Sequence, residues 1–194
     1  MPRRAFYSRR PYTPRAHDHG DPSAATTGMR GRCQCGDVTF TTPTPSPLAI
    51  YVCHCTECRH QSSSAFGITA LFPFFDIPGA EAGNAGCPSS APSSGIGVYT
   101  RHTALGRYVE CLFCCNCGSR LLHRVRDQIP GHKDYIHREG FVPTVSVKAG
   151  CLDALTKEAL DEATHIWCES TVVPIPAGVR QWPRRPEGGT LVRR

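Results

Sequence analysis

The stretch FCCNCGSRL at residues 113–121 decides the architecture of this 194-residue chain, because it contains the spacing Cys114-x-x-Cys117-Gly118. A Cys-x-x-Cys pair followed by glycine forms a tight knuckle, whose backbone amides point at the sulfurs and stabilise thiolates. Such a knuckle supplies half of a four-cysteine metal site. The other half must therefore come from a distant part of the chain.

The second half is found upstream, in Cys33-x-Cys35-Gly36. On an extended segment both sulfurs of a Cys-x-Cys pair point to the same side, because side-chain direction alternates along a strand. The two pairs together predict a closed tetrahedral site of four thiolates. Zinc suits such a site, and iron is its main rival.

A third cluster, Cys53-x-Cys55-x-x-Cys58, supplies three more thiolates. Three protein ligands and one open position are typical of catalytic zinc. The sequence leaves open the alternative that a fourth protein ligand closes this site. The candidate fourth ligands are Cys87, Cys111, Cys115, His54 and His60. The other two cysteines, Cys151 and Cys168, are expected to be small buried hydrophobes.

Short segments rich in β-branched and apolar residues surround the clusters and predict an all-β, or β-dominated, fold. The expected strands are residues 38–40, 48–53, 65–75, 98–103, 108–114, 119–125, 144–148 and 165–173. Pro73 marks an edge or an end of its strand. Residues 152–160 are expected to form one or two helical turns, and residues 80–97 a long loop, either a lid or an insertion.

The net charge of +6 is concentrated at the two ends of the chain. Each end carries about +4, which leaves about −2 for the middle. We therefore expect a disordered basic tail at 1–30, a zinc-binding domain at 31–173 and a basic Pro/Arg-rich tail at 174–194. A nucleic-acid-binding domain carries its basic patch on the folded part, so nucleic acid is a disfavoured partner.

No secretory signal is expected from the sequence, which contains no run of 18 uncharged apolar residues. No membrane association is expected, and a cytoplasmic location follows as the default. In that reducing compartment, clustered cysteines hold metal more often than they form disulfides.

Several pieces of the sequence resemble the glutathione-dependent formaldehyde-activating enzymes, a family that includes centromere protein V-type members. The matching pieces are GRCQCGDVTF at 31–40, CHCTECR at 53–59 with its sequel to residue 66, FCCNCGSRL at 113–121, VKAGCLD at 147–153 and HIW at 165–167. They follow the family's order over about residues 30–170. The resemblance implies a β-tent fold of antiparallel sheets pinned by a structural zinc. It assigns that zinc to Cys33, Cys35, Cys114 and Cys117, and a second, reactive zinc to Cys53, Cys55 and Cys58.

The activity implied by the resemblance is that of a carbon–sulfur lyase, in which glutathione adds to formaldehyde and the reverse reaction cleaves the C–S bond. We expect a zinc-dependent enzyme acting on adducts of glutathione, its cosubstrate, with formaldehyde or another small electrophile, in biosynthesis or detoxification. His54 is a candidate proton shuttle beside the catalytic cysteines. Ser62, Ser63 and Ser64, or Arg59 and Arg120, are candidates for holding the carboxylates of glutathione. The alternative is a non-catalytic zinc module that binds protein or nucleic-acid partners.

The chain departs from the family at residues 62–66, which read SSSAF where the family commonly has Thr-Gly-Ser-Ala-Phe. Glycine is the usual residue where the backbone must adopt positive φ or approach a ligand closely. If the family glycine has such a conformation, Ser63 changes the pocket at this point.

Overall fold

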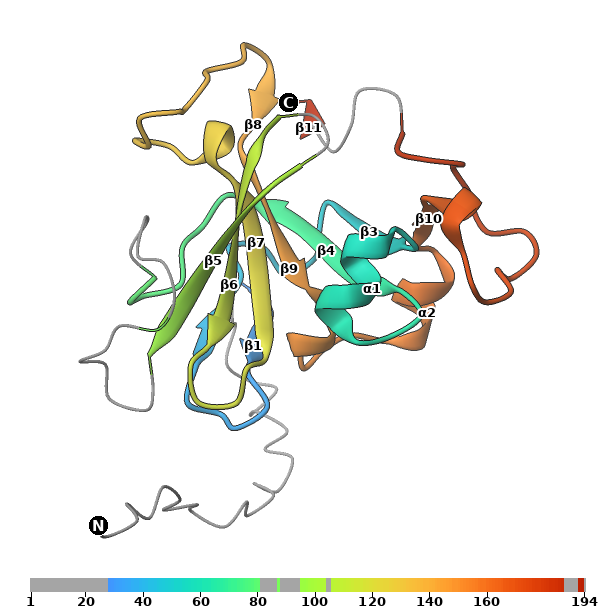
Figure 1. Cartoon of the computed structure of the whole chain (residues 1–194), viewed down its shortest axis with the longest axis horizontal. Coiled ribbons are helices and arrows are strands. Elements are labelled where there is room, and N and C mark those ends of the chain that lie inside the picture. Colours follow the sequence, from blue (N-terminus) through green and yellow to red (C-terminus); the bar gives the residue numbers. More distant parts are fainter. Residues whose placement is uncertain (1–27, 81–86, 88–94, 104–105, 187–191, 194) are drawn as a thin grey trace, which may run out of the picture.

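The structure is a computed structural model of the chain, and it describes residues 28–80, 87, 95–103, 106–186 and 192–193. A seven-stranded sheet forms its centre, with the strand order β10-β3-β4-β9-β7-β6-β5 (Figure 1). Its strands are β3 (Ala49–Cys53), β4 (Gly67–Pro73), β5 (Ile96–His102), β6 (Tyr108–Cys114), β7 (Arg120–Val125), β9 (Thr144–Lys148) and β10 (Thr164–Ile166). All neighbours are antiparallel except β10 and β3, which run parallel.

Two small sheets and a few short helices complete the described chain. The small sheets pair β1 (Arg30–Arg32) with β2 (Thr39–Thr41) and β8 (Phe141–Val142) with β11 (Val192–Arg193). The helices are α1 (Thr56–Ser62), α2 (Lys157–Asp161) and the 3-10 turns η1 (Arg126–Gln128), η2 (Ala149–Cys151) and η3 (Cys168–Ser170). The β-dominated fold expected from the sequence is confirmed. Of the helices described, none is long and apolar enough to span a membrane.

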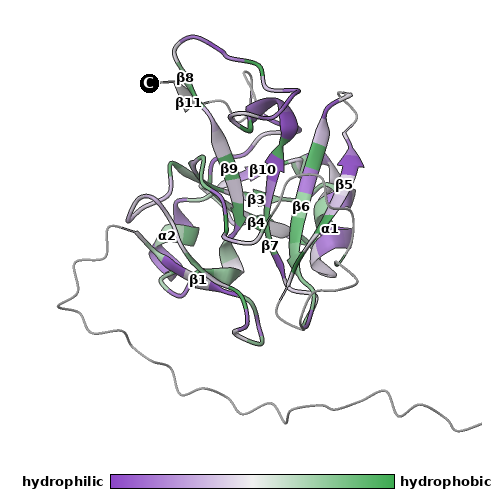
Figure 2. Ribbon diagram, turned by 90° about the vertical axis from the view of Figure 1, so that its left-hand side faces the viewer, coloured by the Kyte–Doolittle hydropathy of each residue, from purple (hydrophilic) through white to green (hydrophobic). Residues whose placement is uncertain are grey.

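One face of the large sheet makes the hydrophobic core. In β9, Val145 and Val147 are buried in that core, together with Leu122 of β7 and Leu112 of β6. Figure 2 shows a polar segment in the upper part of β6 and a continuous apolar stretch below it. Because side chains alternate across a strand, Ser146 and the other intervening residues face the opposite side. The second face of the sheet is therefore free to carry polar chemistry.

Residues 108–114 and 144–148 form strands with the expected bounds, and the clean alternation at 144–148 agrees with a strand that is buried on one face. Two expectations differ from the structure. Helix α1 was not expected from the sequence; it begins within the third cysteine cluster, with Cys55 as its N-cap and Cys58 in its first turn. The expected strand at 165–173 ends at Ile166, because Trp167 has φ of 59° and turns the chain into η3.

Of the basic tail expected at 174–194, the structure describes residues 174–186 and 192–193, while residues 1–27 lie outside the described residues. The chain returns along β10, where the amide of His165 donates to Arg180 O at 2.8 Å and the amide of Trp182 donates to His165 O at 2.9 Å. The Trp182 side chain packs against the third cysteine cluster. Apolar burial of an indole and backbone pairing hold this segment in spite of its basic composition.

A disulfide joins Cys87 to Cys115, and this corrects the expectation that both were candidate metal ligands. Cys115 sits inside the Cys114-x-x-Cys117 knuckle, next to a ligand. Its disulfide partner, Cys87, comes from the 80–97 loop, of which residues 80, 87 and 95–97 are described. Neither sulfur is therefore free to close the three-cysteine cluster.

Candidate metal centres and substrate hollow

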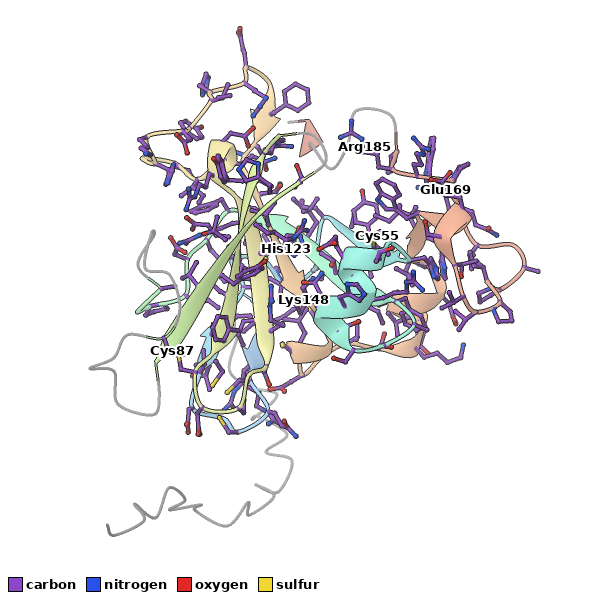
Figure 3. All side chains as sticks on the ribbon, viewed as in Figure 1. Cys55, Cys87, His123, Lys148, Glu169 and Arg185 are labelled. Carbon is purple, nitrogen blue, oxygen red and sulfur yellow. A yellow bond between two sulfur atoms is a disulfide. The ribbon has the colours of Figure 1, made fainter. Side chains whose placement is uncertain are left out.

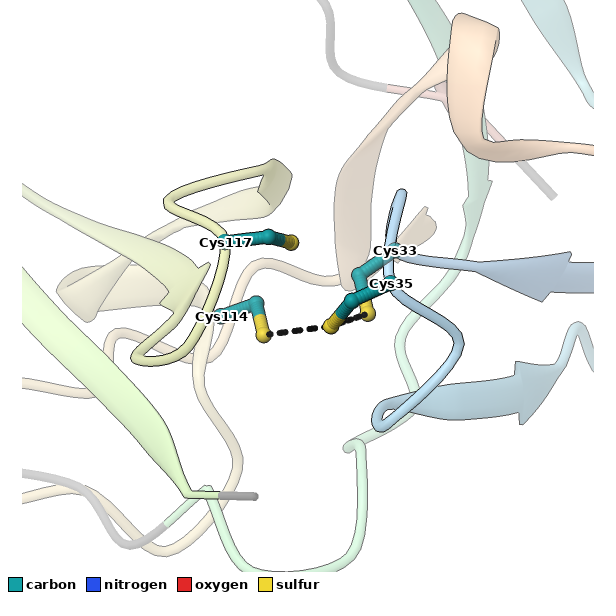
Figure 4. A group of neighbouring side chains, drawn as sticks. All are labelled: Cys33, Cys35, Cys114 and Cys117. Atoms are coloured by element: carbon teal, nitrogen blue, oxygen red, sulfur yellow. Dashed lines mark hydrogen bonds between the residues drawn. The ribbon is translucent and has the colours of Figure 1, made fainter. Parts of the chain in front are cut away.

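The four-cysteine group forms where the β1–β2 connection meets the β6–β7 turn. The sulfurs of Cys33, Cys35, Cys114 and Cys117 all lie within 4.8 Å of one another (Figure 4). Two of the separations are 3.4 Å, for Cys33 to Cys35, and 3.7 Å, for Cys35 to Cys114. Four sulfurs bound to one zinc at 2.3 Å in a tetrahedron would be about 3.8 Å apart. The group therefore fits a tetrahedral metal ion of zinc's size.

Local hydrogen bonds prepare this group for a cation. The amide of Val38 donates to Cys33 Sγ at 3.3 Å, and Cys117 Sγ lies 3.2 Å from Ser119 Oγ. Burial opposes ionisation of Cys117, but hydrogen bonds with the Ser119 hydroxyl and with backbone amides outweigh it and lower its pKa to about 6. Burial raises the pKa of Cys35. A bound cation would overcome that burial cost, since it favours thiolates.

The three-cysteine group lies at the end of β3 and the start of α1. The sulfurs of Cys53, Cys55 and Cys58 also lie within 4.8 Å of one another, with Cys53 and Cys55 at 3.4 Å. Cys55 is the N-cap of α1, and its sulfur accepts the amide of Cys58 at 3.4 Å. Hydrogen bonds from the Cys53 and Cys58 thiols lower the pKa of Cys55 to about 2, so one negative charge is shared within the group.

Among the residues that the structure describes, no fourth histidine, cysteine or carboxylate atom joins this group. The side-chain amide of Gln61 donates a hydrogen bond to Cys58 Sγ at 3.4 Å. Cys111 is buried in β6, outside the group, and His60 is exposed on α1. The geometry thus supports three protein ligands rather than four.

Apolar packing surrounds the three-cysteine group. Cys53, Cys58 and Ile166 form a small core of their own, against which Trp167 and Trp182 pack. Gly67 of β4 passes next to the group, and a Cβ atom there would lie 3.2 Å from Cys58 Cβ and 3.7 Å from its sulfur. Any larger residue at 67 would require Cys58 to shift by a few tenths of an ångström, so glycine suits the close approach of α1 and β4.

His54, expected to be a proton shuttle, is buried with both ring nitrogens hydrogen-bonded. Thr171 Oγ1 donates to Val173 O, so it accepts the Nδ1–H of His54 at 3.2 Å. His54 Nε2 then accepts from His165 Nδ1 at 3.0 Å. Burial, together with His165, lowers the pKa of His54 and keeps it neutral. These hydrogen bonds link His54 to His165 of β10 and to Thr171. The catalytic role of His54 stays a prediction.

The expected substrate residues Arg59, Ser63 and Ser64 line one open hollow of about 590 Å³, together with His60, Ala65 and Val172. Arg59 and His60 directly follow the metal-site cysteine of α1 in sequence. Ser62 is not part of the lining, and its hydroxyl lies 2.8 Å from Cys58 O and 2.9 Å from Phe66 O, to one of which it donates. None of the three cysteines lines the hollow, which offers one guanidinium and two hydroxyls from the end of α1 and the residues after it.

Ser63 has the left-handed conformation that the family glycine suggests, with φ of 49° and ψ of 40° at the C-cap of α1. Trp167, at φ 59°, is the one other non-glycine residue with positive φ in the described chain. Both flank the three-cysteine group. Strained backbone of this kind clusters at functional sites, where the surrounding structure enforces it.

Replacing Ser63 with glycine is expected to stabilise the protein by roughly 0.5–1 kcal/mol, because glycine adopts positive φ without steric cost. Urea unfolding of Ser63→Gly would show the midpoint rising with an unchanged slope. Ser64→Gly is the matched control, since Ser64 does not have positive φ and gains only unfolded-state freedom. A Ser63→Gly midpoint equal to or below that of the wild type would contradict the prediction.

The polar face of the sheet carries two residues that were not expected at the site, Lys148 of β9 and His123 of β7. Figure 3 shows both on the side of the sheet that faces α1 and Cys55. The nitrogens Lys148 Nζ and His123 Nδ1 are buried and have no hydrogen-bond partner among the described residues. A lysine at the end of an alternating strand is commonplace, so no sequence signal marked it.

Comparison with known proteins places the chain in a family. The sequence profile of the glutathione-dependent formaldehyde-activating enzymes matches residues 28–170, which include both cysteine groups. A crystal structure of a Rhodobacter sphaeroides protein is similar over 71% of this chain and 99% of that chain, at 18% identity and a TM-score of 0.41. No curated protein matches the chain significantly. The profile covers well over half of the sequence, and the chain therefore belongs to the glutathione-dependent formaldehyde-activating enzyme family.

Proposed function

We propose that this protein is a zinc-dependent carbon–sulfur lyase-type enzyme that forms or cleaves the C–S bond of a glutathione adduct with formaldehyde or another small electrophile. The observation that carries the proposal is the three-cysteine group, which lacks a fourth protein ligand in the described chain. A polar hollow is lined by residues of the same helix and of the segment that follows it. The family match supports the reaction class. A closed four-cysteine group elsewhere supports a separate structural role for the first site.

Cys53, Cys55 and Cys58 would hold the catalytic zinc. When bound, zinc supplies a Lewis-acidic position that keeps a substrate thiol ionised near neutral pH. The sulfur chemistry of the group suits this ion, because three thiolates leave one coordination position and prefer a soft or borderline metal.

The chain's own residues bind and orient the thiol substrate. Arg59 and the hydroxyls of Ser63 and Ser64 line the hollow, and they suit the carboxylates of glutathione. Trp167 and Trp182 pack on the other side of the cysteines and exclude water there. In the addition, the thiolate sulfur forms a bond to the carbonyl carbon while the C=O π pair moves onto oxygen, which takes up a proton. The reverse sequence cleaves the same bond.

The direct test combines metal content and glutathione binding in the wild type and in Cys55→Ser. We expect two metal ions per chain in the wild type, one in Cys55→Ser, and loss of glutathione binding with the second ion. In protein loaded with cobalt, glutathione should also change the visible absorption of the wild type but not of the variant.

The matched control is Cys168→Ser, a half-buried free cysteine outside both groups, which should leave metal content and glutathione affinity unchanged. Two metal ions without any glutathione affinity would overturn the enzyme proposal. That outcome would favour the alternative, a non-catalytic zinc module that binds protein or nucleic-acid partners.

A further inference from the structure

The polar face of the large sheet carries a line of residues that leads away from the three-cysteine group. The register pairs Cys53 of β3 with Gly67 of β4, and Thr69 of β4 with Lys148 of β9. Residues 67 and 69 lie on the same face of β4, because side chains alternate along a strand. Lys148 therefore shares the face of Cys53, one strand beyond β4.

The same face continues into the neighbouring strands. Ser146 of β9 pairs with His123 of β7, and His123 pairs with Cys111 of β6. Their neighbours Val147 and Leu122 point into the hydrophobic core on the opposite face. Figure 3 shows His123 and Lys148 side by side between the sheet and α1. The polar face thus brings Lys148, His123 and Cys111 together beside the thiolates.

Lys148 is oriented against the usual behaviour of its residue type. A lysine normally buries its apolar stem and exposes its ammonium group. Here the side chain is half-buried, yet Nζ itself is buried and makes no hydrogen bond to any described residue. Arg120, at the start of β7, likewise has a buried Nε without a partner among those residues. Burial lowers the pKa of Lys148, while the nearby sulfurs of Cys58, Cys111 and Cys53 act in the opposite direction. A buried cation without a hydrogen-bonding partner is costly, so any counter-charge must come from these thiolates or from a ligand.

Positive charge is in excess at this place. Of the ion pairs formed by the described residues, none includes Lys148 or Arg120. Burial, followed by the charges of Lys148, Arg101 and Arg120, holds the pKa of His123 well below its usual range, so His123 is a neutral donor and acceptor. A divalent ion with three thiolates carries a net charge of −1, which offsets only one of these cations.

Elsewhere the protein pairs a fully buried cation. Arg124 has no exposed side-chain surface, and it contacts both Glu110 and Asp76. Arg59 of α1 also has a buried Nε without a partner among the described residues, but Lys148 and Arg120 contrast with Arg124 in that no carboxylate pairs with them. This contrast points to a ligand that is not part of the chain.

We propose that Lys148, Arg120 and His123 form a carboxylate-binding site next to the three-cysteine group, so that the enzyme's substrates include one whose carboxylate is held on this face of the sheet. The inference rests on the proposed function for the reaction itself. It adds a substrate class, because a site for a carboxylate beside the reacting sulfur favours an anionic carbonyl compound, or a carboxylate of the thiol, over formaldehyde alone. A charge-assisted hydrogen bond from Lys148 and one from Arg120 would hold the two oxygens.

The test uses acetate as the probe and the zinc-loaded full-length protein. Titration with ¹³C-labelled acetate, monitored by NMR line broadening, should show saturable binding to the wild type. Acetamide, the neutral analogue of acetate, should not bind. Lys148→Met should weaken acetate binding at least tenfold, whereas Lys148→Arg, which keeps the charge, should weaken it less than threefold. Lys157→Met is the matched control, since Lys157 is an exposed lysine of α2, and its affinity should equal that of the wild type.

Competition then identifies the source of the carboxylate. If glutathione displaces acetate, the site holds a carboxylate of the thiol. If glutathione and acetate bind together, the site holds the carboxylate of the electrophile. Arg59→Gln separates this site from the hollow, because it should leave acetate binding intact while weakening glutathione binding. Failure of the proposed function would appear separately, as absence of glutathione binding in a protein that still binds acetate.

Equal acetate affinity in Lys148→Met and the wild type would overturn the proposal, as would absence of saturable acetate binding to the wild type. Loss of zinc from Lys148→Met with unchanged acetate affinity would also overturn it, and would make Lys148 a counter-charge for the thiolates. If Lys148→Met does not fold, Arg120→Gln carries the same test, with the same tenfold loss expected.

Discussion

Replacing Cys114 with serine is expected to remove one metal ion and to abolish cooperative folding at 37 °C. Cys114 and Cys33 are fully buried in the main core, and their group joins two segments about 80 residues apart in the sequence. Structural zinc contributes an apparent 10–16 kcal/mol, on the order of or above the whole stability of a small domain, about 5–15 kcal/mol. Losing one of four ligands would forfeit much of that contribution.

Metal content and thermal unfolding followed by circular dichroism would measure this effect. Cys151→Ser is the matched control, because Cys151 is a half-buried cysteine outside both groups, with its sulfur 3.1 Å from Arg120 O. It should keep its metal and lose no more than about 1.5 kcal/mol. Cys55→Ser should also remain folded, since its group joins segments that are adjacent in sequence. A Cys114→Ser protein with unchanged metal content and unfolding temperature would refute the structural role of the four-cysteine group.

Replacing Glu110 with glutamine is expected to destabilise the protein by about 3–5 kcal/mol. Glu110 is fully buried and accepts Arg124 Nε at 3.0 Å and Arg126 Nε at 2.9 Å. Without its negative charge, the buried Arg124 keeps only Asp76, which is half-exposed. An uncompensated buried charge is far more costly than the loss of an ordinary hydrogen bond.

Urea unfolding of the single variants and of the double variant Glu110→Met with Arg124→Met would isolate the cause. If the loss comes from the charge left behind, the double variant should recover most of the stability, because neither partner is then buried alone. Asp161→Asn, which removes an exposed pair with Lys157, is the control and should cost less than about 0.5 kcal/mol. A loss below 1 kcal/mol for Glu110→Gln would contradict the prediction.

Local sequence determined the elements whose signal is contained within a few neighbouring residues. The alternation at residues 144–148 predicts β9, because one face of that strand must be buried, and the largely apolar run at 108–114 predicts β6. The spacing within each cysteine cluster likewise predicted which sulfurs would gather. Both kinds of signal depend on side chains two or three residues apart, whose relative directions the backbone geometry fixes.

Some elements were missed because their local signals are weak or point elsewhere. Helix α1 has only seven residues, and its N-cap is a cysteine, a residue that the sequence assigned to metal binding. Short helices depend on tertiary packing more than on propensity, so they leave little trace in the sequence. The β-branched residues at 171–173 suggested a strand, but Trp167 in left-handed conformation ends β10 before them.

Tertiary structure alone decided which distant groups share a site. The strand order places β9 between β4 and β7, and this brings the ammonium group of Lys148 to the face that holds the three-cysteine group. The tertiary structure also joins Cys87 to Cys115 in a disulfide and buries Glu110 against Arg124. The sequence specifies each residue's type and its face on a strand. Burial and charge pairing depend on which strands become neighbours, and that follows from the packing of the whole chain.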